Sequence, residues 1–410
     1  MKKILVLVAA VLCTVLSFTG CGGKSGSQEK TGGKTKLVIW DYFETDSQKI
    51  MMTQLLDGFN KTHPDYEATH VYVPFADYQK QLTLGIASGE LPDLVIMDGC
   101  SMAAFVKLGL LADISSADLP WNEYLAGPME SSMLDGKHYG LPFATNCTAL
   151  IYNKDIFDAA GVAYPDENTT WEQFREMARK LTKNGISGFG NAATNTDEGT
   201  FQCLQWLYTA GGSYKDIEGG VKAFEFMQDM IKEGIWTNEA VNWTQSDVNY
   251  NFMGGSLAME QNGSWQIPVF EASAPDLNYG VTVLPKFDEK SGQATSILGG
   301  ENIGVVKKAD TTGGIEFLKY YNQDNVMVET MKLYGSFPPK IEAAKNPFWT
   351  DDPVQAAFIK QLETSIPRGP SPSWPSYSAA IQNGFQEIMT MKKTPAQAAA
   401  DTQKAVNAIK

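Results

Sequence analysis

Short apolar runs alternate with helix-like segments in the first third of the chain. Residues 36–40 form a β-type run, and residues 46–59 then place apolar side chains three or four positions apart, as in an amphipathic helix. The same order returns in residues 68–74 and 77–87, and residues 89–98 lead into a continuous apolar strand, typical of burial on both faces. Because strands and helices alternate, the pattern predicts a parallel α/β sheet.

The middle of the chain is richer in helix-type patterns, and β-type runs return after it. Residues 200–210 and 220–233 have helical periodicity, whereas residues 279–285 and 297–306 are β-forming, as if the chain crossed back to the first sheet. Residues 353–410 are again helical in pattern. Repeated crossings between two α/β lobes would place a cleft between them, where ligands usually bind.

The N-terminus has the pattern of an export signal. Lys2 and Lys3 precede an apolar run over residues 4–15, and small residues then lead to Cys21, which predicts a lipoprotein signal peptide with the lipid on Cys21. An ordinary secretory signal with a chance cysteine is the alternative. The polar, glycine-rich stretch that follows predicts a flexible tether, and no later run is long and apolar enough to span a membrane. We therefore expect a soluble, extracytoplasmic body anchored to the cell membrane by lipid.

Charge and cysteine content narrow the classes of partner. The net charge of −14 argues against nucleic acid as a partner. Of the 5 cysteines, one falls in the predicted signal peptide and Cys21 takes the lipid. The remaining three, Cys100, Cys147 and Cys203, allow at most one disulfide, and the sequence leaves open whether any forms.

Enzyme motifs are scarce in this chain. It has no Gly-x-Ser-x-Gly elbow and no complete Gly-x-x-x-x-Gly-Lys-Ser/Thr phosphate loop, and His63, His70 and His138 do not form a metal-ligand pattern. We therefore predict no catalytic residue, no metal and no cofactor. A secreted glycosidase with two opposed carboxylates is the competing enzyme class. The pair Tyr320-Tyr321 resembles a ferric-ion ligand pair, but its helical setting favours packing.

Four separated segments carry a family resemblance. Residues 136–161 contain Leu-Ile-Tyr-Asn-Lys-Asp, residues 89–93 read Gly-Glu-Leu-Pro-Asp, residues 251–265 end in Gly-Ser-Trp, and residues 393–399 read Lys-Thr-Pro-Ala-Gln-Ala-Ala. In their order along the chain they resemble the extracellular solute-binding proteins of ABC importers, family 1, the maltose-binding-protein-like sugar receptors. The resemblance extends over nearly the whole chain after the predicted signal peptide.

The resemblance implies an α/β fold of two lobes, each a sheet flanked by helices, with hinge strands between them. It implies a binding protein and no enzyme: a monomer that closes on a small-molecule saccharide, expected to be an oligosaccharide, and delivers it to the transmembrane subunits of an ABC permease. Polyamine, metal or peptide receptors remain alternatives, because they share this lobe plan. The implied boundaries are residues 1–20 for the signal peptide, 21–35 for the tether, 36–145 and 300–340 for the N-terminal lobe, and 146–299 and 341–410 for the C-terminal lobe.

A saccharide offers flat C–H faces and a rim of hydroxyls, so its site needs aromatic faces and polar side chains. The resemblance places Trp265, Trp374 and Phe201 at aromatic positions and Asn146 at a polar one on the first crossing, although core packing is the alternative for both tryptophans. Other candidates follow the carboxyl ends of strands or the glycine pair at 299–300. The candidate ligand-binding residues are Trp40, Asp41, Phe43, Glu44, Asp98, Asn146, Phe201, Trp265, Glu301, Asn302, Trp374 and Tyr377.

Overall fold

The computed structural model describes residues 33–410, of which Thr35–Lys410 form one compact unit. The predicted signal peptide, the predicted lipid-attachment site Cys21 and most of the predicted tether lie outside the described residues. Within the described part of the chain, no helix is both long and apolar enough to cross a membrane.

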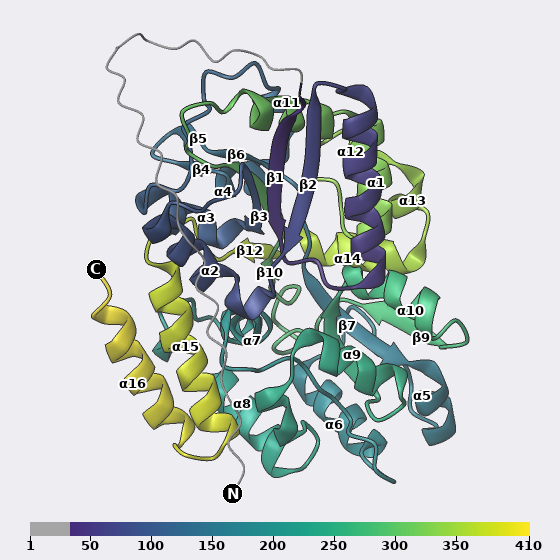
Figure 1. Cartoon of the computed structure of the whole chain (residues 1–410). Coiled ribbons are helices and arrows are strands. Elements are labelled where there is room, and N and C mark those ends of the chain that lie inside the picture. The colour runs from purple at the N-terminus through teal and green to yellow at the C-terminus, as the bar shows by residue number, and fades with distance from the viewer. Residues whose placement is uncertain (1–32) are drawn as a thin grey trace, which may run out of the picture. The chain divides into compact units, whose positions relative to one another are not determined.

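A five-stranded mixed sheet forms the first lobe (Figure 1). Its strands, in spatial order, are β2 (Tyr66–Tyr72), β1 (Thr35–Asp41), β3 (Leu94–Asp98), β11 (Glu301–Val305) and β6 (Gly140–Pro142). The first three are parallel, as the alternation of strands and helices predicts. The prediction of a parallel sheet is wrong for β11, which is antiparallel to both β3 and β6 because the chain enters it from the other lobe. β6 therefore runs in the same direction as β1, β2 and β3.

Helices cover both faces of this sheet, which explains the continuous apolar run in β3. Leu94 and Ile96 belong to the core that includes α1, α11 and α12, whereas Val95 and Met97 belong to a second cluster with α2 and α3. The elements of this lobe outside the sheet are α1 (Asp46–Thr62), α2 (Phe75–Ser88), α3 (Gly99–Lys107), η1 (Trp121–Glu123), α4 (Ala126–Ser131), the hairpin β4 (Met133–Leu134) and β5 (Lys137–His138), α11 (Thr312–Tyr321) and α12 (Asp324–Tyr334).

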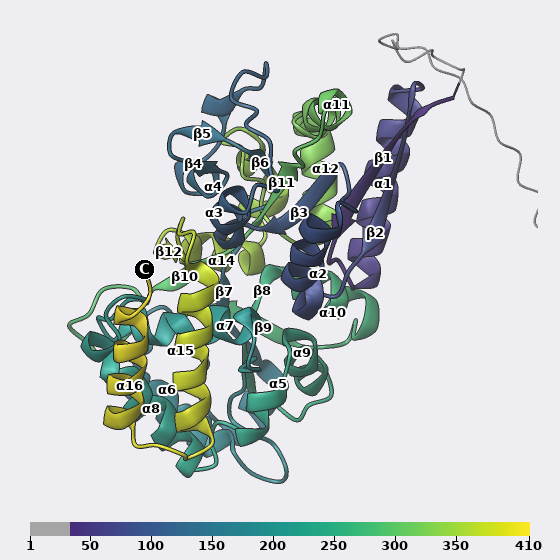
Figure 2. The same cartoon turned by 60° about the vertical axis from the view of Figure 1, so that its left-hand side comes forward.

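The second lobe is built on a three-stranded antiparallel sheet and is rich in helices (Figure 2). The strands, in spatial order, are β8 (Met259–Gly263), β7 (Thr148–Asn153) and β9 (Tyr279–Thr282). The accompanying elements are α5 (Lys154–Ala160), α6 (Trp171–Leu181), α7 (Asp197–Thr209), η2 (Glu218–Gly220), α8 (Val221–Lys232), η3 (Asn238–Asn242), α9 (Gln245–Met253), η4 (Ser264–Gln266), α10 (Ile267–Ser273), η5 (Ala343–Lys345), α13 (Pro347–Thr350), α14 (Pro353–Leu362), α15 (Trp374–Met389), α16 (Pro395–Asn407) and the strand pair β10 (Ser296–Leu298) and β12 (Ser365–Pro367).

Three chain segments pass between the lobes side by side. The first crossing joins β6 to β7, and its Thr145 and Asn146 pair with Phe337 and Gly299 of the other two crossings. Asn146 N donates to Gly299 O at 3.3 Å, and Gly299 N donates to Asn146 O at 2.8 Å. Gly300 has φ +120°, and a Cβ there would lie 2.2 Å from Ala144 O, so only glycine fits this position.

The segment with the strongest family resemblance forms the predicted strand and helix. β7 is buried along its whole length, Asn153 caps α5 by accepting from Ile156 N, and Gly161 ends the helix with φ 65°. Tyr320 and Tyr321 are packed on α11, as predicted. Among the described residues, Cys100, Cys147 and Cys203 are buried and unpaired. The lobe boundaries given from the sequence stay a prediction.

Candidate functional site

A cavity of about 290 Å³, which we call the first cavity, lies between the two lobes at the crossings. The first lobe contributes the ends of β1, β3 and α12 and the beginnings of α1 and α2, and the second lobe contributes α7, α9 and η4. The lining residues are Tyr42, Glu44, Thr45, Gln48, Pro74, Phe75, Ala76, Asp98, Asn146, Glu198, Phe201, Thr244, Gln245, Ser246, Trp265, Gln266, Gly299, Gly300, Glu301, Tyr334 and Arg368.

Six of the twelve predicted site residues lie on this lining. They come from both lobes and from the crossings, although they are far apart in the sequence. They are Glu44, Asp98, Asn146, Phe201, Trp265 and Glu301.

Three of the other predicted residues lie at the end of β1. Asp41 is fully buried and not on the lining, and its side chain accepts from Phe43 N at 3.0 Å and contacts His70 Nδ1 at 2.7 Å. Phe43 is buried in the core, and Trp40 packs against the α2–α3 cluster. Tyr42, between Asp41 and Phe43, is the residue of this segment that reaches the cavity.

The last three predicted residues are also off the first cavity. Asn302 is buried and donates from Nδ2 to Ser131 Oγ at 2.9 Å, because it points to the opposite face of β11 from Glu301. Trp374 is fully buried, as its core-packing alternative predicts. Tyr377 packs edge-on against Tyr214, with ring centroids 5.1 Å apart.

Glu301 lines the cavity and has one buried carboxylate oxygen without a hydrogen-bond partner. Only 7% of the residue is exposed, and its Oε1 accepts from Tyr334 Oη at 2.7 Å and from Tyr42 Oη at 3.3 Å. Its Oε2 has no partner. Burial raises the pKa of Glu301 to about 7, although the tyrosine hydrogen bonds oppose this rise. A hydroxyl donor from a solute would satisfy Oε2.

A second pair of carboxylates lies on the lining near α9. Glu198 accepts from Gln245 N at 2.5 Å, and burial raises its pKa to about 7. Glu44 accepts from Ser246 Oγ at 2.6 Å, which joins the first lobe to the second. These acids have no lysine or arginine among their hydrogen-bond partners in the described residues.

Arg368, just after β12, joins two aspartates from different lobes. Its Nη2 donates to both oxygens of Asp98 at 2.8 and 2.7 Å, and its Nη1 donates to Asp197 Oδ2 at 2.9 Å. Asp197 Oδ1 accepts from Trp374 Nε1 at 2.8 Å and from Ser378 Oγ at 2.5 Å. Burial acts to lower the pKa of Arg368, but the two negative charges raise it above its ordinary value. The guanidinium is therefore a permanent charge that is already neutralised.

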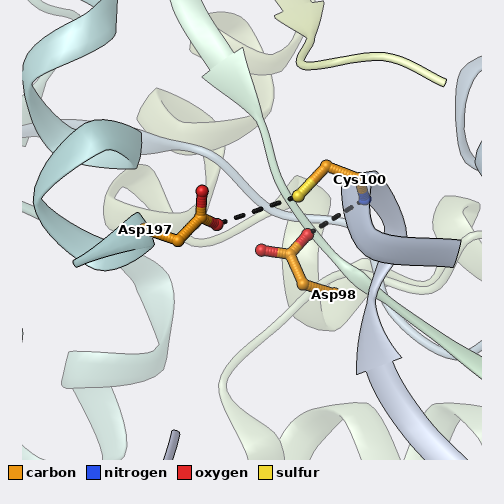
Figure 3. Close-up of side chains that lie close together, drawn as sticks. All are labelled: Asp98, Cys100 and Asp197. Carbon is orange, nitrogen blue, oxygen red and sulfur yellow. Dashed lines mark hydrogen bonds between the residues drawn. The ribbon is translucent and has the colours of Figure 1, made fainter. Parts of the chain in front are cut away.

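Asp98, Cys100 and Asp197 place oxygen and sulfur atoms within 4.8 Å of one another (Figure 3). Asp98 caps α3 by accepting from Cys100 N, and Cys100 Sγ lies 3.8 Å from Asp197 Oδ2. Both carboxylates already bind Arg368, and burial raises the pKa of the Cys100 thiol well above its usual value. The arrangement is therefore that of an internal ion cluster, with the guanidinium as its cation.

Aromatic rings from both lobes give the cavity apolar faces. Trp265 and Phe201 lie with their ring centroids 6.3 Å apart, and Phe75 packs edge-on against Tyr42 at 4.9 Å. A Cβ at Gly263 would lie 1.9 Å from the indole of Trp265, so glycine allows this ring to lie against the backbone. The same lining holds the carboxylates of Glu44, Glu198 and Glu301.

Several lining residues were missed at the level of the sequence: Tyr42, Phe75, Glu198, Tyr334 and Arg368. Arg368 lies in Ile-Pro-Arg-Gly-Pro, whose two prolines and glycine signal a loop within a region read as helical. Tyr42 lies between two residues that were chosen. Nothing in the local sequence singles out Glu198 or Tyr334.

Comparison with known proteins gives one consistent answer. The family model described as bacterial extracellular solute-binding protein matches residues 54–357. A galactooligosaccharide-binding protein of Bacillus subtilis is 26% identical, covering 98% of this chain and 96% of the relative. An sn-glycerol-3-phosphate-binding periplasmic protein of Agrobacterium fabrum is 25% identical, covering 79% of this chain and 80% of the relative.

Solved structures show the same fold. An ABC transporter solute-binding protein of Thermotoga lettingae, bound with α-D-tagatose, superposes with a TM-score of 0.84 at 23% identity, covering 91% of this chain and 99% of that one. The family resemblance and the two-lobed α/β fold inferred from the sequence are thereby confirmed. The family and these neighbours are binding proteins.

Proposed function

Because this chain belongs to the bacterial extracellular solute-binding proteins, we propose that it captures a neutral saccharide in the first cavity and delivers it to the permease subunits of an ABC importer. The observation that carries the proposal is the unpartnered Oε2 of Glu301, buried on a wall that also presents aromatic rings. A sugar hydroxyl supplies the missing donor, and the rings accept the C–H faces of the sugar.

Charge on the lining supports a neutral solute over a phosphate ester. Arg368 is the one lysine or arginine on the described lining, and Asp98 and Asp197 already neutralise it. Glu44, Glu198 and Glu301 would repel an added phosphate. We therefore do not expect this cavity to bind sn-glycerol 3-phosphate, the ligand named for the Agrobacterium fabrum relative. An uncharged polyol suits the hydrogen-bond acceptors of the lining.

A cationic solute such as a polyamine is the second candidate. The same three carboxylates have no cation of their own, and aromatic faces attract ammonium groups. Because the pKa values of Glu198 and Glu301 are both about 7, these groups are largely protonated below neutral pH, where they suit hydroxyls better than a cation. Ionisation of these groups between pH 6 and pH 8 should therefore strengthen the binding of a cation far more than the binding of a hydroxyl.

Capture would operate by closure of the lobes. The wall of the first cavity comes from both lobes, so a solute that fills it gains contacts that an open form cannot make. Such a solute shifts the equilibrium towards the closed form, which is the form that would dock on the permease. The three paired crossings are the segments about which the lobes would turn.

The family is extracellular, so the protein acts outside the cytoplasm. We further propose that residues 1–20 are removed, that Cys21 carries the lipid, and that the monomeric body is held at the membrane by the tether. Metabolic labelling with a fatty-acid analogue should label the parent protein and not Cys21→Ala, which should appear in the medium. Equal labelling of both would contradict acylation at Cys21.

Isothermal titration calorimetry of the protein, started at residue 22, tests the proposed function. The panel comprises neutral mono- to tetrasaccharides of several hexoses, sn-glycerol 3-phosphate and spermidine, each at pH 6 and pH 8. We expect saturable binding of a neutral saccharide at both pH values and none of the phosphate. Binding of spermidine alone, strengthening sharply at pH 8, would replace the saccharide with a cationic solute.

A further inference from the structure

Asp41 and His70 form a hydrogen-bonded pair outside the first cavity. Asp41, at the end of β1, is fully buried, and its Oδ2 accepts from Nδ1 of His70 on β2 at 2.7 Å. The side chain of His70 is 27% exposed. Neither residue lines the first cavity. The pair therefore does not contact a solute there, and any effect that it has on binding must pass through another residue.

We propose that Asp41 and His70 are positioning residues, which hold Tyr42 in the wall of the first cavity so that its hydroxyl stays on Glu301. This inference rests on the proposed function. It adds to that function two residues that set the affinity for the saccharide without touching it.

Asp41 fixes the turn that follows β1. Its Oδ1 accepts from Phe43 N at 3.0 Å, which closes an Asx turn around Tyr42. The backbone before the turn is also held, because Tyr78 Oη donates to Trp40 O at 2.8 Å. The chain on both sides of Tyr42 is therefore fixed by hydrogen bonds, and the carboxylate of Asp41 supplies one of them.

His70 holds that carboxylate in place. A carboxylate oxygen accepts and does not donate, so Nδ1 of His70 carries the hydrogen of the bond to Asp41. The same bond raises the pKa of His70, although burial opposes this rise. Without His70, Asp41 Oδ2 would be a buried acceptor without a donor, which is costly. We expect the carboxylate then to rotate away from Phe43 N and loosen the turn.

Tyr42 carries the effect of the pair into the site. Its ring packs edge-on against Phe75 and Tyr78, with centroids 4.9 and 5.1 Å apart. It lines the first cavity and also a second cavity of about 460 Å³, which shares part of this wall. Its hydroxyl donates to Glu301 Oε1 at 3.3 Å, which is long for a bond between oxygens, so a small displacement of the turn would break it. Tyr334 alone would then hold the carboxylate of Glu301, and Oε2 would lose its fixed position.

The test removes the donor of His70 and asks whether the loss passes through Tyr42. His70→Val removes Nδ1 and suits an edge strand. In His70→Asn, the amide Nδ2 takes the place of Nδ1 and should restore the bond. His63→Val is the matched control, because His63 follows α1 and stacks on Phe59 away from the cavity. Calorimetry measures the affinity of each variant for the saccharide that binds best to the parent protein.

We expect His70→Val to weaken binding about tenfold, as for the loss of one hydrogen bond to a carboxylate. His70→Asn should bind within about twofold of the parent, and His63→Val should bind as the parent does. In a Tyr42→Phe background, which lacks the hydroxyl, adding His70→Val should cost no more than about twofold. Urea denaturation of each variant separates a change in affinity from a change in stability.

Four outcomes would overturn the positioning role. They are unchanged affinity in His70→Val, no recovery in His70→Asn, and an equal loss from His70→Val with and without Tyr42→Phe. The fourth is failure of His70→Val to fold, since His70 would then serve the fold as a whole. If no saccharide binds the parent at all, the proposed function itself fails, which distinguishes the two failures.

Discussion

The acids at the boundary between the two lobes differ in their hydrogen-bond partners. Asp98 and Asp197 bind a guanidinium, and each of their four oxygens has a hydrogen-bond donor. Glu301 has only tyrosine hydroxyls on one oxygen and nothing on the other. Asp98 and Asp197, which share the guanidinium of Arg368, join the two lobes. Glu301 has no cation beside it, so its Oε2 can accept a hydrogen bond from a solute. The predictions below separate these two roles.

The largest effect is expected at the ion cluster. Arg368→Met should lower the free energy of unfolding by about 3–5 kcal/mol, because it leaves two aspartates in the interior without a cation. Urea denaturation followed by circular dichroism measures this loss. Lys340→Met is the matched control, since Lys340 is also buried but pairs with the exposed Glu123 and Asp324, and it should cost clearly less. Equal losses in the two variants would contradict a structural role specific to the cluster.

The next effect concerns the apolar wall of the receptive site. Trp265→Ala should weaken saccharide binding by about 2 kcal/mol or more, as expected for a buried aromatic anchor, and the protein should still fold. Calorimetry measures the affinity. Trp121→Ala removes a tryptophan that stacks on His138 away from both cavities and should leave the affinity unchanged. If Trp265→Ala binds as tightly as the parent, Trp265 does not belong to the site.

A smaller effect is expected at the acid with the open oxygen. Glu301→Gln should weaken binding about tenfold, because the amide replaces an acceptor for a sugar hydroxyl with a second donor. The solute hydroxyl favours the ionised form of Glu301, whose pKa is about 7 in the free protein, so parent affinity should rise as pH increases from 6 to 8. The variant should have a weaker pH dependence. An identical pH profile in both proteins would exclude Glu301 as the group that titrates.

The smallest effect concerns a buried acid in neither group. Glu260 on β8 is fully buried, its Oε1 has no partner, and burial raises its pKa to about 8. Above pH 4.5 the unfolded chain releases this proton while the folded protein keeps it, so Glu260 makes stability fall between about pH 4.5 and 8. Glu260→Gln should therefore raise the free energy of unfolding at pH 8 by about 1 kcal/mol or more, with little change at pH 5. A gain of equal size at both pH values would contradict this titration.

Local sequence patterns predicted correctly those features that depend on a single helix or strand. The run at 89–98 became a strand buried on both faces, and Asn153 and Gly161 mark the ends of a short helix as expected. The carboxyl ends of strands did bring Asp98 to the cavity, but not Asp41, because the chain turns after β1 so that Tyr42 takes the position on the wall. A shift of one position along the chain is therefore enough to change which side chain reaches the cavity.

The sequence by itself determined the family, the two-lobed α/β fold and six residues that meet in one cavity, because apolar periodicity, caps and family motifs are local. Only the tertiary structure decided that Arg368 neutralises Asp98 and Asp197. It also decided that the buried Trp374 donates a hydrogen bond to Asp197, and that Glu301 Oε2 has no hydrogen-bond partner. Charge pairing and burial depend on groups that are more than 150 positions apart in the chain, as with Arg368 and Asp197. No local sequence pattern predicts contacts between residues so far apart in the chain.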